Sequence, residues 1–197
     1  MEDEKSLTGE ESLAIITRMI NKAKCEYEET GVSALLWGSV ITICSLVSFT
    51  GRQLDIDSLD YIWFLPIGAV AAQVIIAVRE SRRKKYRSYD DATMGGIWIS
   101  FGISMFLFSF YASKFNIPHA NVLFLIVYGI PTFATGISRN FKPMIWGGIA
   151  CWLLAVAAMY TKPPYTLLYT AVAAQLAWFI PGLILRKRYV KARSGNV

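Results

Sequence analysis

The hydrophobic residues of this chain form six long runs that contain no Asp, Glu, Lys or Arg. The runs cover residues 30–51, 61–78, 92–113, 115–138, 143–161 and 163–185. A helix that crosses a bilayer needs about 20 apolar residues, within a range of about 17–25, and each run is long enough. The pattern predicts an all-α, polytopic bundle of six transmembrane helices, at residues 32–50, 61–79, 94–113, 120–138, 144–160 and 166–185.

Charged residues are confined to the connections between these runs. The chain is 54% hydrophobic and 17% charged, yet its formal net charge is +6. Of the 20 Lys and Arg residues, all but Arg52, Lys114 and Lys162 precede the first run or follow the second, fourth and sixth. Basic connections stay in the cytoplasm, so we expect both termini there, in a plasma membrane. This asymmetry explains the basic charge without a nucleic-acid partner.

Residues 8–29 predict a cytoplasmic amphipathic helix ahead of the first span. Thr8 and Glu11 have the spacing of a capping box, and apolar residues recur at helical spacing from Leu13 to Ile20. The acidic start argues against a signal peptide. Such a helix can lie on the inner leaflet, pack on its own bundle or receive a partner. The chain is therefore divided into a cytoplasmic segment (1–30), a membrane domain (31–186) and a basic cytoplasmic tail (187–197).

The six spans are expected to form three helical hairpins in series. Each odd span has a Trp near its start, and these are Trp37, Trp98 and Trp146. Spans two and six share the sequence Ala-Val-Ala-Ala-Gln, at 69–73 and 171–175. Either the hairpins are parallel repeats about a pseudo-threefold axis, or the aromatic-belt rule alone makes unrelated helices look alike. The predicted topology is the same in both cases.

Small residues are the candidates for holding the helices together. Lipid is as apolar as Leu, so transmembrane helices associate through close backbone approach and polar contacts. Pro66, Pro131 and Pro181 each lack a backbone donor and are expected to kink their helices. The candidate packing residues are Gly38, Gly68, Gly96, Ser100, Ser104, Gly147 and Gly148.

Residues that carry chemistry are scarce. The six charge-free runs contain no Asp, Glu, Lys or Arg, whereas coupled pumps and exchangers usually hold such a group at membrane depth. The single His119 has no companion ligands, and Cys25, Cys44 and Cys151 have no CxxC spacing. The chain has no phosphate-binding glycine loop, no GxSxG elbow and no HExxH motif. We expect no catalytic residue, no metal site and no cofactor, and so not an enzyme.

Two groups of polar residues are candidates for binding. Gln73 and Gln175 are the most polar side chains in the spans, and the shared pentapeptide places them at equivalent points. A buried amide needs hydrogen bonds, so they either join helices or line a site for a neutral or zwitterionic ligand. A basic cluster follows span two, and it either fixes the topology or holds anionic lipid headgroups. Its members are Arg79, Arg82, Arg83, Lys84, Lys85 and Arg87.

Three short segments near the N-terminus carry a family resemblance that would cover the whole chain. Residues 7–13 (LTGEESL), 19–24 (MINKAK) and 31–40 (GVSALLWGSV) resemble uncharacterised six-span inner-membrane proteins of Bacteroidota-type bacteria. The three-hairpin layout is also similar, in architecture alone, to HdeD-type acid-resistance membrane proteins. The resemblance implies a bacterial inner membrane and brings no activity or site residues with it.

These features together favour a protein that works by contact. We expect a non-enzymatic membrane protein that acts as a structural, regulatory or accessory subunit through lipids, a partner protein or self-association. The alternative is a small transporter or channel for a neutral or zwitterionic solute, which would pass through a cavity between the hairpins.

Overall fold

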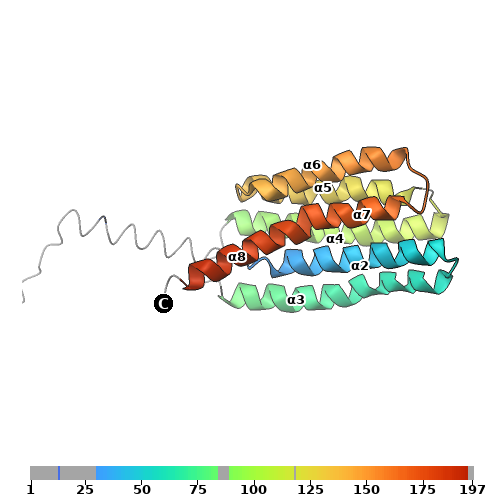
Figure 1. Ribbon diagram of the computed structural model, residues 1–197. Helices are drawn as coiled ribbons and strands as arrows, with labels where there is room; N and C mark the ends of the chain where they lie inside the picture. The colour runs from blue at the N-terminus through green and yellow to red at the C-terminus, as the bar shows by residue number, and fades with distance from the viewer. Residues whose placement is uncertain (1–12, 14–29, 84–88, 118, 195–197) are drawn as a thin grey trace, which may run out of the picture.

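The protein is a bundle of long helices (Figure 1). The computed structural model describes residues 13, 30–83, 89–117 and 119–194, and all regular elements in these residues are helical. Six helical stretches are long and apolar enough to cross a membrane, which confirms the six predicted spans. The amphipathic helix predicted at 8–29 lies, apart from Leu13, outside the described residues.

Each span corresponds to one helix or to a continuous series of helical segments. The second span begins with a 3-10 helix, η1, and the sixth contains a π-helical turn, η2. The elements are α2 (Val32–Gln53), η1 (Asp57–Phe64), α3 (Leu65–Arg83), α4 (Tyr89–Phe115), α5 (Ala120–Ser138), α6 (Lys142–Met159), α7 (Thr166–Ala174), η2 (Gln175–Phe179) and α8 (Ile180–Ser194).

The last span lies at the centre of the packing. Its segments α7 and η2 contact α2, α5 and α6, and α8 contacts α2 and α6. The helices α5 and α6 form the most extensive pair. By contrast, α3 packs only on α2 and η1, and the backbone of α4 approaches only α5, so that α3 and α4 do not meet within the described residues.

Burial follows the same division. In its most apolar 18-residue stretch, the last span has 50% of its residues buried, and α2, α5 and α6 have 33–44%. The corresponding share is 6% for the span that contains α3 and 0% for α4. The core is therefore built by four spans, and α3 and α4 are attached to its outside.

The start of α2 depends on a glycine in a left-handed conformation. Gly31 precedes α2 with φ 71°, and its carbonyl accepts a hydrogen bond of 3.1 Å from the N–H of Leu35. A Cβ at Gly31 would lie 2.5 Å from the carbonyl oxygen of Gly182 on α8. Both the φ angle and the close approach require glycine here.

The prolines act differently in the three spans that contain them. Pro131 lies inside α5, as predicted, and the π-helical turn η2 ends immediately before α8, whose second residue is Pro181. Pro66 is the second residue of α3, where the 3-10 helix η1 continues directly into α3. Pro66 and Pro181 therefore both lie where the type of helix changes within a span.

Glycines bring the core helices into contact around η2. A Cβ at Gly38 of α2 would lie 2.7 Å from the backbone nitrogen of Phe179, and one at Gly147 of α6 would lie 2.7 Å from the Cα of Ala177. The π-helical turn is thus held between glycines of two different helices. Such close backbone approach supplies the van der Waals contact that replaces the hydrophobic effect within a bilayer.

Candidate functional site

The two intramembrane glutamines each donate a hydrogen bond to α2. The amide nitrogen of Gln73, on α3, donates to the hydroxyl of Ser33 at 3.0 Å. That of Gln175, at the start of η2, donates to the hydroxyl of Thr42 at 2.8 Å. The Thr42 hydroxyl in turn donates to the carbonyl of Gly38 at 2.7 Å. Both glutamines therefore join a neighbouring helix to α2.

The structure does not bring these two glutamines together. Their partners Ser33 and Thr42 are nine residues apart on α2, which corresponds to about 14 Å along the axis at about 1.5 Å per residue. The elements that carry them, α3 and η2, do not contact each other within the described residues. The Oε1 atom of Gln73 is buried without a hydrogen-bond partner in the described part of the chain. A single ligand site made by both amides has no geometric basis in this arrangement.

Two tryptophan–threonine hydrogen bonds hold α4, α5 and η2 together near Pro131. The indole N–H of Trp178 donates to the hydroxyl of Thr132 at 2.9 Å, and that of Trp98 donates to Thr135 at 3.0 Å. Each threonine hydroxyl also donates to the carbonyl four residues before it on α5. The hydroxyls therefore link side chains of two other helices to the backbone of α5 beside its proline.

An aromatic cluster surrounds these hydrogen bonds. The Trp178 ring lies 5.0 Å from Tyr128, 6.2 Å from Trp98 and 6.3 Å from Phe101, measured between centroids. Aromatic pairs at such distances add about 0.5–1.5 kcal/mol beyond their buried area in proteins. This cluster attaches α4 to α5 and η2. The sequence did not predict this cluster, because Trp98 also fits an interfacial aromatic belt. The available signal was Thr132 and Thr135, which follow Pro131 within one helical turn.

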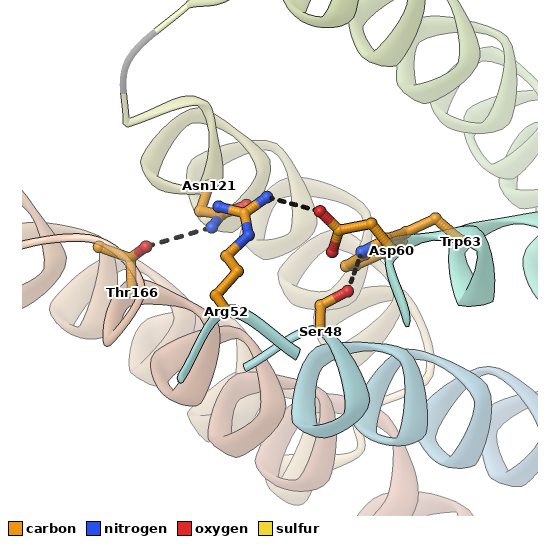
Figure 2. Close-up of polar contacts among 6 residues, drawn as sticks. All are labelled: Ser48, Arg52, Asp60, Trp63, Asn121 and Thr166. Atoms are coloured by element: carbon orange, nitrogen blue, oxygen red, sulfur yellow. Dashed lines mark hydrogen bonds and ion pairs between the residues drawn. The ribbon is translucent and has the colours of Figure 1, made fainter. Parts of the chain in front are cut away.

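A second polar group joins four segments at the end of the bundle remote from the basic connections (Figure 2). Arg52 of α2 forms an ion pair of 3.5 Å with Asp60 of η1, and each side chain is about half exposed, at 48% and 42%. The indole of Trp63 donates to the Ser48 hydroxyl at 2.7 Å. The final contact of the group is a 3.1 Å hydrogen bond from Asn121 of α5 to Thr166 of α7. These contacts fasten η1 to α2 and the start of α5 to the start of α7.

Part of the basic cluster after span two is visible. Arg79 and Arg82 are exposed at the end of α3. The side chain of Arg83 and all of Lys84, Lys85 and Arg87 lie outside the described residues. Glu80, between the two visible arginines, accepts a hydrogen bond from the Thr30 hydroxyl.

The candidate packing residues divide into two groups. Gly38, Gly147 and Gly148 lie against other helices, the last of them facing Phe133 of α5. A Cβ at Gly68 or at Gly96 would have no atom within 4 Å in the described residues. Ser100 and Ser104 are exposed on α4 as well. The candidate packing residues that do not lie against another helix of the described structure all belong to α3 and α4.

Two open grooves lie on the surface of the described structure. One, of about 340 Å³, is lined by Thr161, Tyr165, Leu168, Tyr169 and Val172. Another, of about 320 Å³, is lined by Leu46, Val47, Thr50 and Leu59. Neither reaches Gln73 or Gln175.

The described residues contain no group of three or more His, Cys, Asp or Glu that could hold a metal ion. Cys44 and Cys151 are buried free thiols in the spans. The glutamine, tryptophan and threonine side chains described above form interhelical hydrogen bonds. The exposed surface includes the apolar exterior of α3 and α4 and the basic residues at the helix ends. No protein-family model, curated protein or solved structure matches this chain.

Proposed function

We propose that this chain is a non-enzymatic subunit of a bacterial inner-membrane assembly, with a structural, regulatory or accessory role and both termini in the cytoplasm. The observation that carries the proposal is the exposure of α3 and α4. These two spans have 6% and 0% of their most apolar stretch buried, against at least 33% for every other span. Their outer surfaces are free to contact lipid, a partner protein or a second copy.

The distribution of glycines supports the same proposal. In the core helices, Gly38, Gly147 and Gly148 are used for close backbone contact within the chain. The open glycines of the described residues, Gly68, Gly95, Gly96 and Gly102, lie on α3 and α4. Glycine lowers helix stability by about 1 kcal/mol relative to alanine, so an unpacked glycine in a span is explained when another molecule approaches it.

Transport of a neutral or zwitterionic solute is supported less well. A passage would need polar groups that converge and remain available to the solute. The amides of Gln73 and Gln175 instead donate to α2 at separate levels, and neither of the two grooves described above is lined by them.

Native mass spectrometry of the tagged, full-length protein tests the proposal after gentle extraction from its own membranes. We expect a companion, either another protein or a second copy, at fixed stoichiometry. Gly96→Leu should reduce its retention, because leucine adds bulk to the exposed face of α4. Gly102→Leu is the matched control, since Gly102 is also open but points about 120° away around the same helix.

The outcomes separate the two candidate functions. If both variants retain the companion as well as the wild type does, these faces of α4 are not part of the contact surface. A monomer without a companion that retains a small solute would instead favour transport, and solute flux into proteoliposomes would then be measured for wild type and for Gln175→Leu.

A further inference from the structure

The first turn of α6 contains a backbone amide that no described residue satisfies. Phe141 is the N-cap residue, and its apolar side chain cannot accept a capping hydrogen bond. The N–H groups of Met144 and Ile145 donate to the carbonyl of Phe141, and Pro143 has no N–H. Within the described structure, this leaves the N–H of Lys142 without a partner. The start of a helix also carries the positive end of its dipole, so this position favours an anion.

Basic side chains from two helices lie beside this amide. Lys142 is the first residue of α6, and its side chain is exposed. Arg188 of α8 is also exposed, and its guanidinium carbon lies 5.2 Å from the centroid of the Phe141 ring. Because Phe141 directly precedes Lys142 in the chain, the base of α8 lies next to the start of α6. In the described part of the chain, neither base forms an ion pair with an acidic side chain.

An exposed apolar stripe leads from Lys142 along the outside of α6. Trp146, Leu153 and Val156 follow Lys142 at helical spacing on one face, and all three are exposed. Tryptophan is typical of the headgroup level, and the aliphatic residues continue toward the bilayer centre. A soluble anion would use the amide and the two bases but not this stripe. A phospholipid can use all of them, because its headgroup is followed by acyl chains.

The end of α3 provides an internal comparison. It lies at the same end of the bundle as the start of α6 (Figure 1) and carries the exposed bases Arg79 and Arg82. At this point, however, α3 ends, so that it presents carbonyl groups and the negative end of its dipole. The two places offer the same side-chain charge on opposite kinds of helix terminus. Only the start of α6 combines that charge with an amide donor.

We propose that the start of α6 is a binding site for an anionic phospholipid. The lipid phosphate accepts a hydrogen bond from the N–H of Lys142 and is held by the side chains of Lys142 and Arg188, while an acyl chain lies along Trp146 and Leu153. The inference is independent of the proposed function, because it requires no partner protein and no particular side of the membrane.

The fluorescence of Trp146 reports which lipid lies beside this site. All six tryptophans are within the described residues, and Trp146 alone has an exposed side chain. Its signal is the difference between a protein and the same protein carrying Trp146→Phe. The full-length protein is placed in phosphatidylcholine vesicles with a small, fixed fraction of brominated phosphatidylglycerol or brominated phosphatidylcholine. We expect quenching to show that phosphatidylglycerol is enriched beside Trp146 by at least about threefold over phosphatidylcholine. Equal enrichment in the wild type would overturn the proposal.

Substitutions then separate the site from a general attraction to basic charge. Lys142→Gln combined with Arg188→Gln should reduce the enrichment to about onefold, whereas Lys142→Arg should preserve it. Arg79→Gln combined with Arg82→Gln removes the same charge from the end of α3 and should leave the enrichment unchanged. Unaltered quenching by brominated phosphatidylcholine would show that the outside of α6 is intact in each variant. The proposal fails if the Lys142 and Arg188 variant keeps the enrichment, or if both double variants lose it equally.

Inorganic phosphate distinguishes a lipid site from a site for soluble anions. The enrichment is measured in phosphate buffer and in sodium chloride of the same ionic strength, because general screening is equal in the two solutions. We expect the same enrichment in both. Loss of the enrichment in phosphate alone would show that a soluble anion displaces the headgroup, and it would overturn the assignment of the site to a phospholipid.

Discussion

Replacing two glycines with alanine should change the stability of this protein in opposite directions. A Cβ at Gly147 would lie 2.7 Å from the Cα of Ala177 and 2.8 Å from the carbonyl oxygen of Leu176, and both of these atoms belong to a helix backbone. Carbon atoms normally rest about 3.5–4.0 Å apart. Neither backbone atom can rotate away, so α6 and η2 must separate by about 1 Å. Gly96 of α4 has no atom within 4 Å of the same position in the described structure.

The expected magnitudes follow from these distances. Overpacking of a close contact costs about 1–3 kcal/mol, so Gly147→Ala should lower the free energy of unfolding by that amount. Gly96→Ala creates no clash and removes the helix penalty of glycine, which is worth up to about 1 kcal/mol. The two variants should therefore differ by about 1–4 kcal/mol, although the substitution is chemically identical.

The measurement is unfolding of each variant in mixed micelles by titration with a denaturing detergent, followed by circular dichroism and tryptophan fluorescence. Gly38→Ala is a second test of the close approach, since its Cβ would lie 2.7 Å from the backbone nitrogen of Phe179. If Gly147→Ala stabilises the protein, the inference that α6 packs closely on η2 is wrong. If Gly96→Ala destabilises it as much as Gly147→Ala, the outer face of α4 is covered in the folded protein.

Three further substitutions can be measured in the same titration. Trp178→Phe should lower the free energy of unfolding by at least about 0.6 kcal/mol, because an interhelical hydrogen bond is lost. The control Trp146→Phe, at a position that is 68% exposed, should stay within about 0.5 kcal/mol of wild type. Equal effects of the two substitutions would contradict the buried position of Trp178. Arg52→Gln should cost less than about 1 kcal/mol because its ion pair with Asp60 is half exposed, and a larger loss would show that the pair is shielded from solvent. Gln175→Leu should cost about 0.6–1.7 kcal/mol through the lost hydrogen bond to α2, and no change would contradict its role in joining the last span to the first.

The number of spans could be predicted from the sequence because their length and lack of charge are local properties. A charge-free run of the right length has few alternatives to a membrane-spanning helix, and the structure has six helices that are long and apolar enough. The hairpin arrangement and the cytoplasmic termini remain predictions, because they depend on the membrane and on charge outside it.

The packing partners could not be predicted in the same way. Gly96 and Gly147 occupy similar sequence contexts, but only Gly147 faces another backbone. Nothing in the residue pattern indicates which neighbour each face meets, because α4 is apolar on nearly all sides and any face could be lipid-exposed. Trp98 shows the same limit, since an interfacial tryptophan and one bonded to Thr135 differ only in which helix lies opposite.

The packing of α2 against the last span has a consequence for biosynthesis. Thr42 and Gln175, which join these helices, are separated by 133 residues in the chain. At a synthesis rate of about 5–20 residues per second, the ribosome needs about 7–27 s to synthesise the chain between these two residues. During that interval the inward serines and threonines of the first span face lipid or the insertion machinery. A nascent chain that stops before Thr166 therefore contains five inserted helices without a completed core, and we expect membrane quality-control proteases to degrade it faster than the full-length protein.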